Sequence, residues 1–151
     1  MSSSIRARVL YVDDNEDSRV MLSTLLRFWR IETKAVGTGA QALSSIQAER
    51  FDLYLLDVRL PDLDGFELCR RMRAFDQHTP ILFFSGAAYE ADKKSAIKAG
   101  ANAYVIKPDL AGLIRSIAQF VSQAESATAK IIPFERKMNF FPPFTFEPIA
   151  A

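Results

Sequence analysis

The sequence has very little of the residues that build disulfides, zinc sites and histidine-based catalytic sites. Its 151 residues include one cysteine, Cys69, and one histidine, His78. A single cysteine excludes an intramolecular disulfide and is too few for a structural zinc site built on cysteines. His78 stands just before Thr79-Pro80, where a surface loop is expected, so it offers no convincing metal site or catalytic triad.

The sequence also lacks a strong net charge, a signal segment and a membrane span. The formal net charge is +1, which gives no electrostatic basis for nucleic acid as the main partner. No apolar run approaches the roughly 20 residues that a membrane helix needs. The first six residues contain no hydrophobic signal core. We therefore expect a cytoplasmic protein that has neither nucleic acid nor a membrane as its partner.

What the sequence does have is a globular composition in which apolar runs alternate with helical patterns. Hydrophobic residues make up 49% and charged residues 25% of the chain, whose length fits one domain with a sizeable core. Leu22, Leu25, Leu26 and Trp29 recur at helical spacing after the first run. Strands are expected at about 6–12, 33–36, 51–57, 81–84 and 101–106. This alternation predicts an α/β protein with a doubly wound parallel sheet and helices on both faces.

One of these apolar runs ends abruptly in a carboxylate. The run from Phe51 to Leu56 is followed by Asp57, and then by Pro61 and Asp64-Gly65. Because an unpaired charge is costly inside a sheet, Asp57 is expected at the carboxyl end of the strand, facing a crevice. Ligands bind at that edge in open parallel sheets. On this stretch alone, a turn aspartate that merely starts a loop is an equally good interpretation.

Polar residues also follow the other predicted strands. Asp13 and Asp14 come after the first strand, Ser85 after the fourth and Lys107 after the fifth. Three carboxylates at one sheet edge, with no histidine or cysteine, favour a hard cation such as Mg²⁺. Singly, each residue is also accounted for as a helix cap, a turn former or a solvated charge. That all five stand together at strand ends by chance is a much weaker interpretation.

The same set of residues suits phosphoryl transfer. A carboxylate such as Asp57 can attack phosphorus and form an aspartyl-phosphate. Lys107 would bring a movable positive charge, and Ser85 a small hydroxyl donor, to the phosphoryl oxygens. This chemistry requires positioning and charge stabilisation more than a proton shuttle.

On these residues, the chain resembles the receiver domain of response regulators from bacterial two-component systems, over residues 5–124. The matching positions are Asp13-Asp14, Asp57, Pro61, Asp64-Gly65, Ser85-Gly86 and Lys107-Pro108. The resemblance implies a flavodoxin-like fold with strand order 2-1-3-4-5. It also implies a phosphorelay protein in which Asp57 accepts a phosphoryl group from a histidine kinase or phosphotransfer protein.

The resemblance further implies how the metal is held. Asp14 and Asp57 would coordinate Mg²⁺ directly, Asp13 would act through a water molecule, and the backbone carbonyl of Arg59 would be the third protein ligand. The long cationic side chain of Arg59 lies two residues after Asp57. Our hypothesis is that it tunes the lifetime of the phosphoryl group, and it could pair with Asp13 or Asp14 when metal is absent.

A switch and an output surface are implied as well. Ser85 and Lys107 would grip the phosphoryl group, and Tyr104 matches the family's switch aromatic, which moves inward as Ser85 closes on the phosphate. Alternatively, Tyr104 is an edge-strand aromatic that packs on the fourth helix. Output would be protein–protein contact through the face formed by the fourth helix, fifth strand and fifth helix.

Residues 125–151 differ in composition from the rest of the chain. They contain Pro133, Pro142, Pro143 and Pro148 together with Phe134, Phe140, Phe141, Phe144 and Phe146. Prolines forbid a long helix there, and the phenylalanines are too many for an ordinary disordered tail. We expect this tail to contain no effector domain and to dock, either on its own receiver domain or across a homodimer; a mobile segment that engages a partner is the other possibility.

Three functions compete at this point. The first is a stand-alone phosphorylation-switched signalling module, which is not an enzyme in the ordinary sense. The second is an adaptor that uses the fold without phosphorylation, and the complete set of site residues argues against it. The third is a phosphatase of the haloacid dehalogenase type, which places two aspartates two residues apart after its first strand. Asp13-Asp14-Asn15 does not have that spacing.

Overall fold

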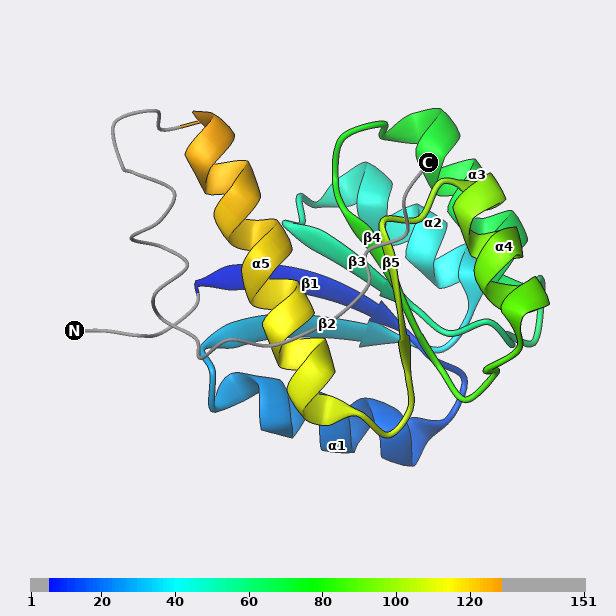
Figure 1. Ribbon diagram of the computed structural model, residues 1–151, viewed down its shortest axis with the longest axis horizontal. Coiled ribbons are helices and arrows are strands. Elements are labelled where there is room, and N and C mark those ends of the chain that lie inside the picture. The colour runs from blue at the N-terminus through cyan, green and yellow to red at the C-terminus, as the bar shows by residue number, and fades with distance from the viewer. Residues whose placement is uncertain (1–5, 129–151) are drawn as a thin grey trace.

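Five strands and five helices alternate along residues 6–128, the part of the chain that the computed structural model describes (Figure 1). The strands are β1 (Ala7–Val12), β2 (Ile31–Val36), β3 (Leu53–Leu56), β4 (Ile81–Ser85) and β5 (Ala103–Ile106). The helices are α1 (Glu16–Arg27), α2 (Gly39–Ala48), α3 (Gly65–Phe75), α4 (Glu90–Ala99) and α5 (Leu110–Thr128). The predicted tail conformation lies outside the described residues, apart from the end of α5.

The strands form one parallel sheet in the order β2-β1-β3-β4-β5, which confirms the predicted doubly wound, flavodoxin-like fold. Val12 at the end of β1 is opposite Val36 on one side and Leu56 on the other. At the far side of the sheet, Ser85 is opposite Ile106. Because the last residues of neighbouring strands are paired with one another, the residues that follow the strands lie at the same edge of the sheet, its carboxyl edge.

Helices cover both faces of this sheet, so the central strands β1, β3 and β4 are buried on both sides (Figure 1). In β1, Val9 and Tyr11 belong to the core under α1 and α5, whereas Leu10 and Val12 belong to the core under α2, α3 and α4. All four are at most 1% exposed. Burying each such apolar side chain contributes about 1.5–3 kcal/mol, which explains why an unbroken apolar run specifies this strand.

Polar caps fix where the helices begin. Asn15, Thr38 and Asp64 each accept a hydrogen bond from the backbone amide three residues further on, at the starts of α1, α2 and α3. Such a cap contributes about 0.5–2 kcal/mol. Gly100 ends α4 with a φ of 108°, a left-handed conformation that favours glycine. None of the helices in the described part of the chain combines the length and the apolar character needed to cross a membrane.

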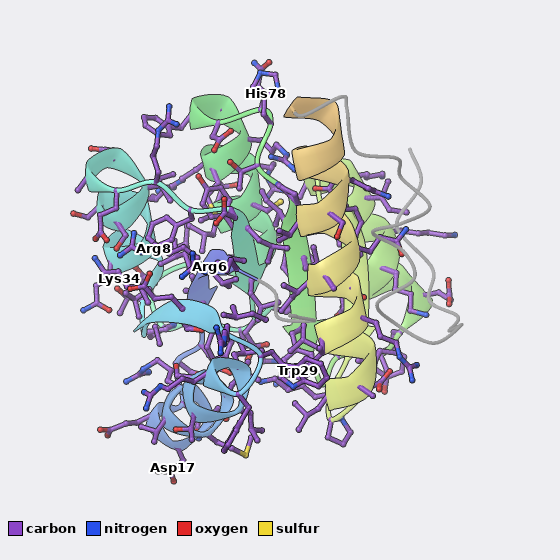
Figure 2. The ribbon with its side chains drawn as sticks, turned by 90° about the vertical axis from the view of Figure 1, so that its left-hand side faces the viewer. Arg6, Arg8, Asp17, Trp29, Lys34 and His78 are labelled. Carbon is purple, nitrogen blue, oxygen red and sulfur yellow. The ribbon has the colours of Figure 1, made fainter. Side chains whose placement is uncertain are left out.

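The turn between α3 and β4 is organised by one carboxylate, that of Asp76. It accepts hydrogen bonds from the Tyr54 hydroxyl (2.7 Å), from the amides of His78 (2.9 Å) and Thr79 (3.1 Å), and from the Thr79 hydroxyl (2.5 Å). Burial acts to raise the pKa of Asp76, but these donors outweigh it and hold the pKa well below its usual range. His78 is exposed in this turn, as expected (Figure 2).

We expect Asp76→Ala to lower the free energy of unfolding by about 2–3 kcal/mol at neutral pH, because the Tyr54 and Thr79 donors lose an ionised acceptor. The pKa of Asp76 is depressed in the folded state, so its contribution is present above pH about 4 and is lost as the pH falls below that value. Urea unfolding at several pH values measures this. Asp52→Asn, which alters a surface carboxylate with one backbone partner, serves as the control. A difference that does not shrink with falling pH would contradict the assignment.

Candidate functional site

Three charged side chains leave the sheet at its carboxyl edge, each from a backbone position held by a neighbouring strand. The amide of Asp13 donates to the last residue of β2 at 3.1 Å. The amide of Asp57 donates to the last residue of β1 at 3.0 Å, and that of Lys107 to the last residue of β4 at 2.9 Å. The ladder hydrogen bonds therefore continue one residue beyond each strand and fix where these side chains start. The bond between Lys107 and Pro108 is cis.

Lys107 joins the other two charges. Its Nζ lies 2.9 Å from Oδ2 of Asp13 and 3.1 Å from Oδ2 of Asp57. The Asp13 side chain is 1% exposed, that of Asp57 13% and that of Lys107 27%. A carboxylate as buried as Asp13 requires a compensating charge, and Lys107 supplies it. The structure thus brings together three of the residues predicted from strand ends in different parts of the chain.

Asp13 accepts two further hydrogen bonds. The Tyr11 hydroxyl donates to Oδ2 at 2.6 Å, and the amide of Asn15 donates to Oδ1 at 2.9 Å. Burial acts to raise the pKa of Asp13, but the donors Tyr11, Asn15 and Lys107 outweigh it and hold the pKa below its usual value. Burial acts to lower the pKa of Lys107, and the two carboxylates raise it above its usual value. The pair therefore stays ionised at neutral pH.

A cation fits beside this pair. Asp13, Asp14 and Asp57 each offer a carboxylate oxygen, and these oxygens lie within 4.8 Å of one another. Within residues 6–128, no other group of three or more acidic, histidine or cysteine side chains is arranged in this way. Asp14 is exposed, so the cluster opens to solvent. An all-oxygen donor set that leaves room for water suits Mg²⁺.

Ser85 and Tyr104 meet at a different point, the backbone of Ala87. Ser85 is 3% exposed, and its Oγ accepts a hydrogen bond from the Ala87 amide at 3.2 Å. The Tyr104 hydroxyl donates to the carbonyl of the same residue at 2.5 Å. The Tyr104 ring stacks on Phe83, with centroids 5.8 Å apart, and burial raises the pKa of Tyr104 to about 12. The loop after β4 is thus connected to both predicted switch residues.

Arg59 remains apart from the charged cluster. Its side chain is exposed, and among residues 6–128 it forms no ion pair with Asp13 or Asp14. The cation that pairs with Asp13 is Lys107 instead.

The loop that carries Asp57 is tightened by Gly65 at the start of α3. The Gly65 amide donates to the carbonyl of Val58 at 2.6 Å. A Cβ added to Gly65 would lie 2.2 Å from the carbonyl oxygen of Asp57, which no side chain can tolerate. The Asp-Gly pair therefore does more than form a turn, because it lets a helix begin directly against the backbone of the central carboxylate.

Two residues at the site are absent from the sequence-based set, namely Tyr11 and Arg19. Arg19 donates from Nη1 to the backbone carbonyl of Asp13 at 2.8 Å, from one turn inside α1. Tyr11 stands two residues before Asp13, so the alternation of a strand places both on the same face of the sheet. This alternation is the sequence signal that could have placed Tyr11 at the site. The sequence alone, however, does not distinguish a tyrosine that bonds a carboxylate from one that only packs in the core.

Comparison with known proteins identifies the family. Residues 9–118 match the family model of the response regulator receiver domain. The chain belongs to this family. Receiver domains are signalling modules of two-component systems rather than classical enzymes.

The similar proteins are response regulators and isolated receiver domains. The DNA-binding response regulator MtrA of Mycolicibacterium smegmatis is 37% identical over 105 residues, which cover 70% of this chain and 46% of MtrA. The regulatory protein AtoC of Escherichia coli is 32% identical over 124 residues, which cover 82% of this chain and 27% of AtoC. The chain therefore spans less than half of these curated relatives.

Solved structures agree with this assignment. A CheY-like receiver domain protein from Methanospirillum hungatei superposes with a TM-score of 0.76 at 27% identity, covering 82% of this chain and 99% of its own. The receiver domain of the sensor histidine kinase PA1611 from Pseudomonas aeruginosa has a TM-score of 0.71 at 31% identity, covering 78% of this chain and 98% of its own. In that protein, a magnesium ion is coordinated in the active-site cleft.

We expect Tyr11→Phe to raise the pKa of Asp13, because the buried carboxylate loses one of its three donors. Loss of a hydrogen bond to a charged group should also lower the free energy of unfolding by about 1.5–3 kcal/mol. An NMR titration of the Asp13 carboxyl carbon and urea unfolding measure the two effects. Tyr89→Phe is the control, because Tyr89 is 80% exposed and is not among the donors to Asp13. An Asp13 that titrates as in the unmodified protein would show that the hydroxyl has no electrostatic role.

Proposed function

We propose that this protein is a phosphorylation switch in which Asp57 accepts a phosphoryl group from the phosphohistidine of a histidine kinase or phosphotransfer protein. The observation that carries the proposal is the position of Lys107, whose Nζ lies 3.1 Å from Oδ2 of Asp57 and 2.9 Å from Oδ2 of Asp13. Such a cation serves a group that becomes more negative during a reaction. The 13% exposure of Asp57 leaves its carboxylate accessible to a donor.

The chemistry follows from these positions. A carboxylate oxygen of Asp57 forms a bond to phosphorus while the bond from phosphorus to the donor's histidine nitrogen breaks. Oδ1 of Asp57 is held by the amide of Val58 at 2.7 Å, which orients the carboxylate. Lys107, already beside Oδ2, moves onto the phosphoryl oxygens, and the hydroxyl of Ser85 joins it.

Asp14, Asp57 and the carbonyl of Arg59 would hold Mg²⁺, with Asp13 acting through a water molecule. When bound, the ion offsets the repulsion between the carboxylates and an incoming phosphoryl group. The three carboxylates, whose oxygens lie within 4.8 Å of one another, support this assignment.

Output requires that the state of Asp57 reaches a surface. Ser85 and Tyr104 both hydrogen-bond the backbone of Ala87. Because Ser85 gives up its bond to the Ala87 amide when it turns to a phosphoryl group, the loop and Tyr104 rearrange together. This loop leads into α4, which has the exposed Tyr89 as its N-cap and carries the exposed Ile97 on its surface. The face formed by α4, β5 and α5 is the output surface for a protein target.

The test is incubation with Mg²⁺ and a small acyl phosphate, followed by intact-mass measurement. We expect the wild-type protein to gain the mass of one phosphoryl group and Asp57→Ala to gain none. Asp52→Asn is the matched control, because Asp52 precedes β3 at the opposite edge of the sheet, whereas Asp57 follows it. No gain in the wild-type protein would overturn the proposal and favour a phosphorylation-independent adaptor.

We also expect Arg59→Ala to shorten the lifetime of the phosphorylated form. The exposed guanidinium is free to approach phosphoryl oxygens on its neighbour, and such an exposed pair contributes about 0.2–1 kcal/mol. The rate of phosphoryl loss should therefore rise by up to about fivefold. Decay of the phosphorylated mass with time measures it, and Arg59→Lys, which keeps the charge, should retain part of the effect. Identical decay in Arg59→Ala and wild type would rule out this role.

A further inference from the structure

An apolar groove lies between the second half of α1 and the first turns of α5. Its walls are formed mainly by Leu22, Leu25, Phe28 and Trp29 on one side and by Leu110 and Ile114 on the other, and its volume is about 480 Å³. Figure 2 shows Trp29 beside the lower part of α5. We call this feature the α1–α5 groove.

The groove is presented by a well-formed turn. The amides of Phe28 and Trp29 donate to the carbonyls of Leu25 and Leu26 at 3.1 and 2.9 Å, and the next residue, Arg30, has a φ of 59°. This hydrogen-bonded turn fixes the backbone under both aromatic residues. Phe28 is nevertheless 80% exposed and Trp29 41% exposed. Two adjacent aromatic side chains held at the surface beside a groove mark a docking site for an apolar segment.

The chain contains a segment whose chemistry matches. Residues 139–146 read Asn-Phe-Phe-Pro-Pro-Phe-Thr-Phe and carry no charge. A Pro-Pro pair favours the extended polyproline conformation, which needs no backbone hydrogen-bond partners. Proline-rich extended segments dock in grooves lined by aromatic residues, and phenylalanine rings pack well against tryptophan. The segment lies outside the described residues.

Length decides whether the segment can reach the groove of its own chain. α5 runs from Leu110 to Thr128, so its 19 residues are about 28 Å long. The groove lies at the first turns of this helix. An extended chain covers about 3.3 Å per residue, so returning along the whole helix takes about nine residues. Phe140 stands twelve residues after Thr128 and Phe146 eighteen, so both can reach the whole groove. Phe134, six residues after, spans only about 20 Å and falls short of Leu110 at the far end.

We propose that residues 139–146 dock in the α1–α5 groove of the same chain. The short connection gives the segment a high effective concentration at the groove, which favours its own chain over a second copy. The proposal does not depend on phosphorylation of Asp57.

Trp29 makes the proposal directly measurable, because it is the only tryptophan of the chain. We expect replacement of Phe140, Phe141, Phe144 and Phe146 by serine in the full-length protein to shift the Trp29 emission to longer wavelength. Quenching of Trp29 by acrylamide should increase as well. Phe134→Ser is the matched control and should leave both unchanged. Circular dichroism and urea unfolding show whether the variants remain folded.

A peptide of residues 137–149 provides a second measurement. Added in excess to the four-serine variant, it should return the Trp29 emission toward that of the wild-type protein. Unchanged emission and quenching in the four-serine variant, with the fold intact, would overturn the proposal. Sedimentation distinguishes docking within one chain from docking across two copies. A wild-type protein that is a dimer and a four-serine variant that is a monomer would show docking across two copies and would overturn docking within one chain.

Discussion

The contact on which the site depends is the double ion pair of Lys107 with Asp13 and Asp57. Asp13 is 1% exposed, and a charge buried to that degree is tolerated only with a close partner. Lys107 comes from 94 residues further along the chain than Asp13, and 50 further than Asp57. The parallel sheet is what makes the meeting possible, because it brings the ends of β1, β3 and β5 to one edge.

Strand alternation divides the site into two parts. Tyr11, Leu55 and Val105 all face the core under α1 and α5, and the residues two positions later are Asp13, Asp57 and Lys107. Phe83 and Tyr104 face the opposite core, under α2, α3 and α4. Asp13, Asp57 and Lys107 thus extend the face of the sheet that α1 and α5 cover, whereas Tyr104 lies on the opposite face. The loop after β4 joins the two, because Ser85 and Tyr104 both bind the backbone of Ala87.

Much of this arrangement could be predicted from the sequence, because apolar runs that are buried on two faces and closed by carboxylates are compatible with few folds. The doubly wound fold and the cluster of Asp13, Asp57 and Lys107 follow from that reasoning, whereas the strand order was implied by the resemblance to receiver domains. The predicted ends of the helices and strands were less accurate. The strand expected to begin at Phe51 begins at Leu53 and is β3, Leu53–Leu56. Trp29 lies two residues beyond the end of α1, although its spacing is helical. The hydrogen bond from Tyr11 to Asp13 could not be predicted, since the sequence of a buried strand does not show which polar atom finds a hydrogen-bond partner.

The most direct test of this account is a double-mutant cycle on Lys107 and Asp13, measured by urea unfolding at pH 7 without divalent cations. The variants are Lys107→Met, Asp13→Asn and the two combined. If the pair holds the site together, each single substitution removes the same interaction, so their effects will fail to add by about 1.5–3 kcal/mol. Strictly additive effects would mean that the two side chains do not interact, and would contradict the account.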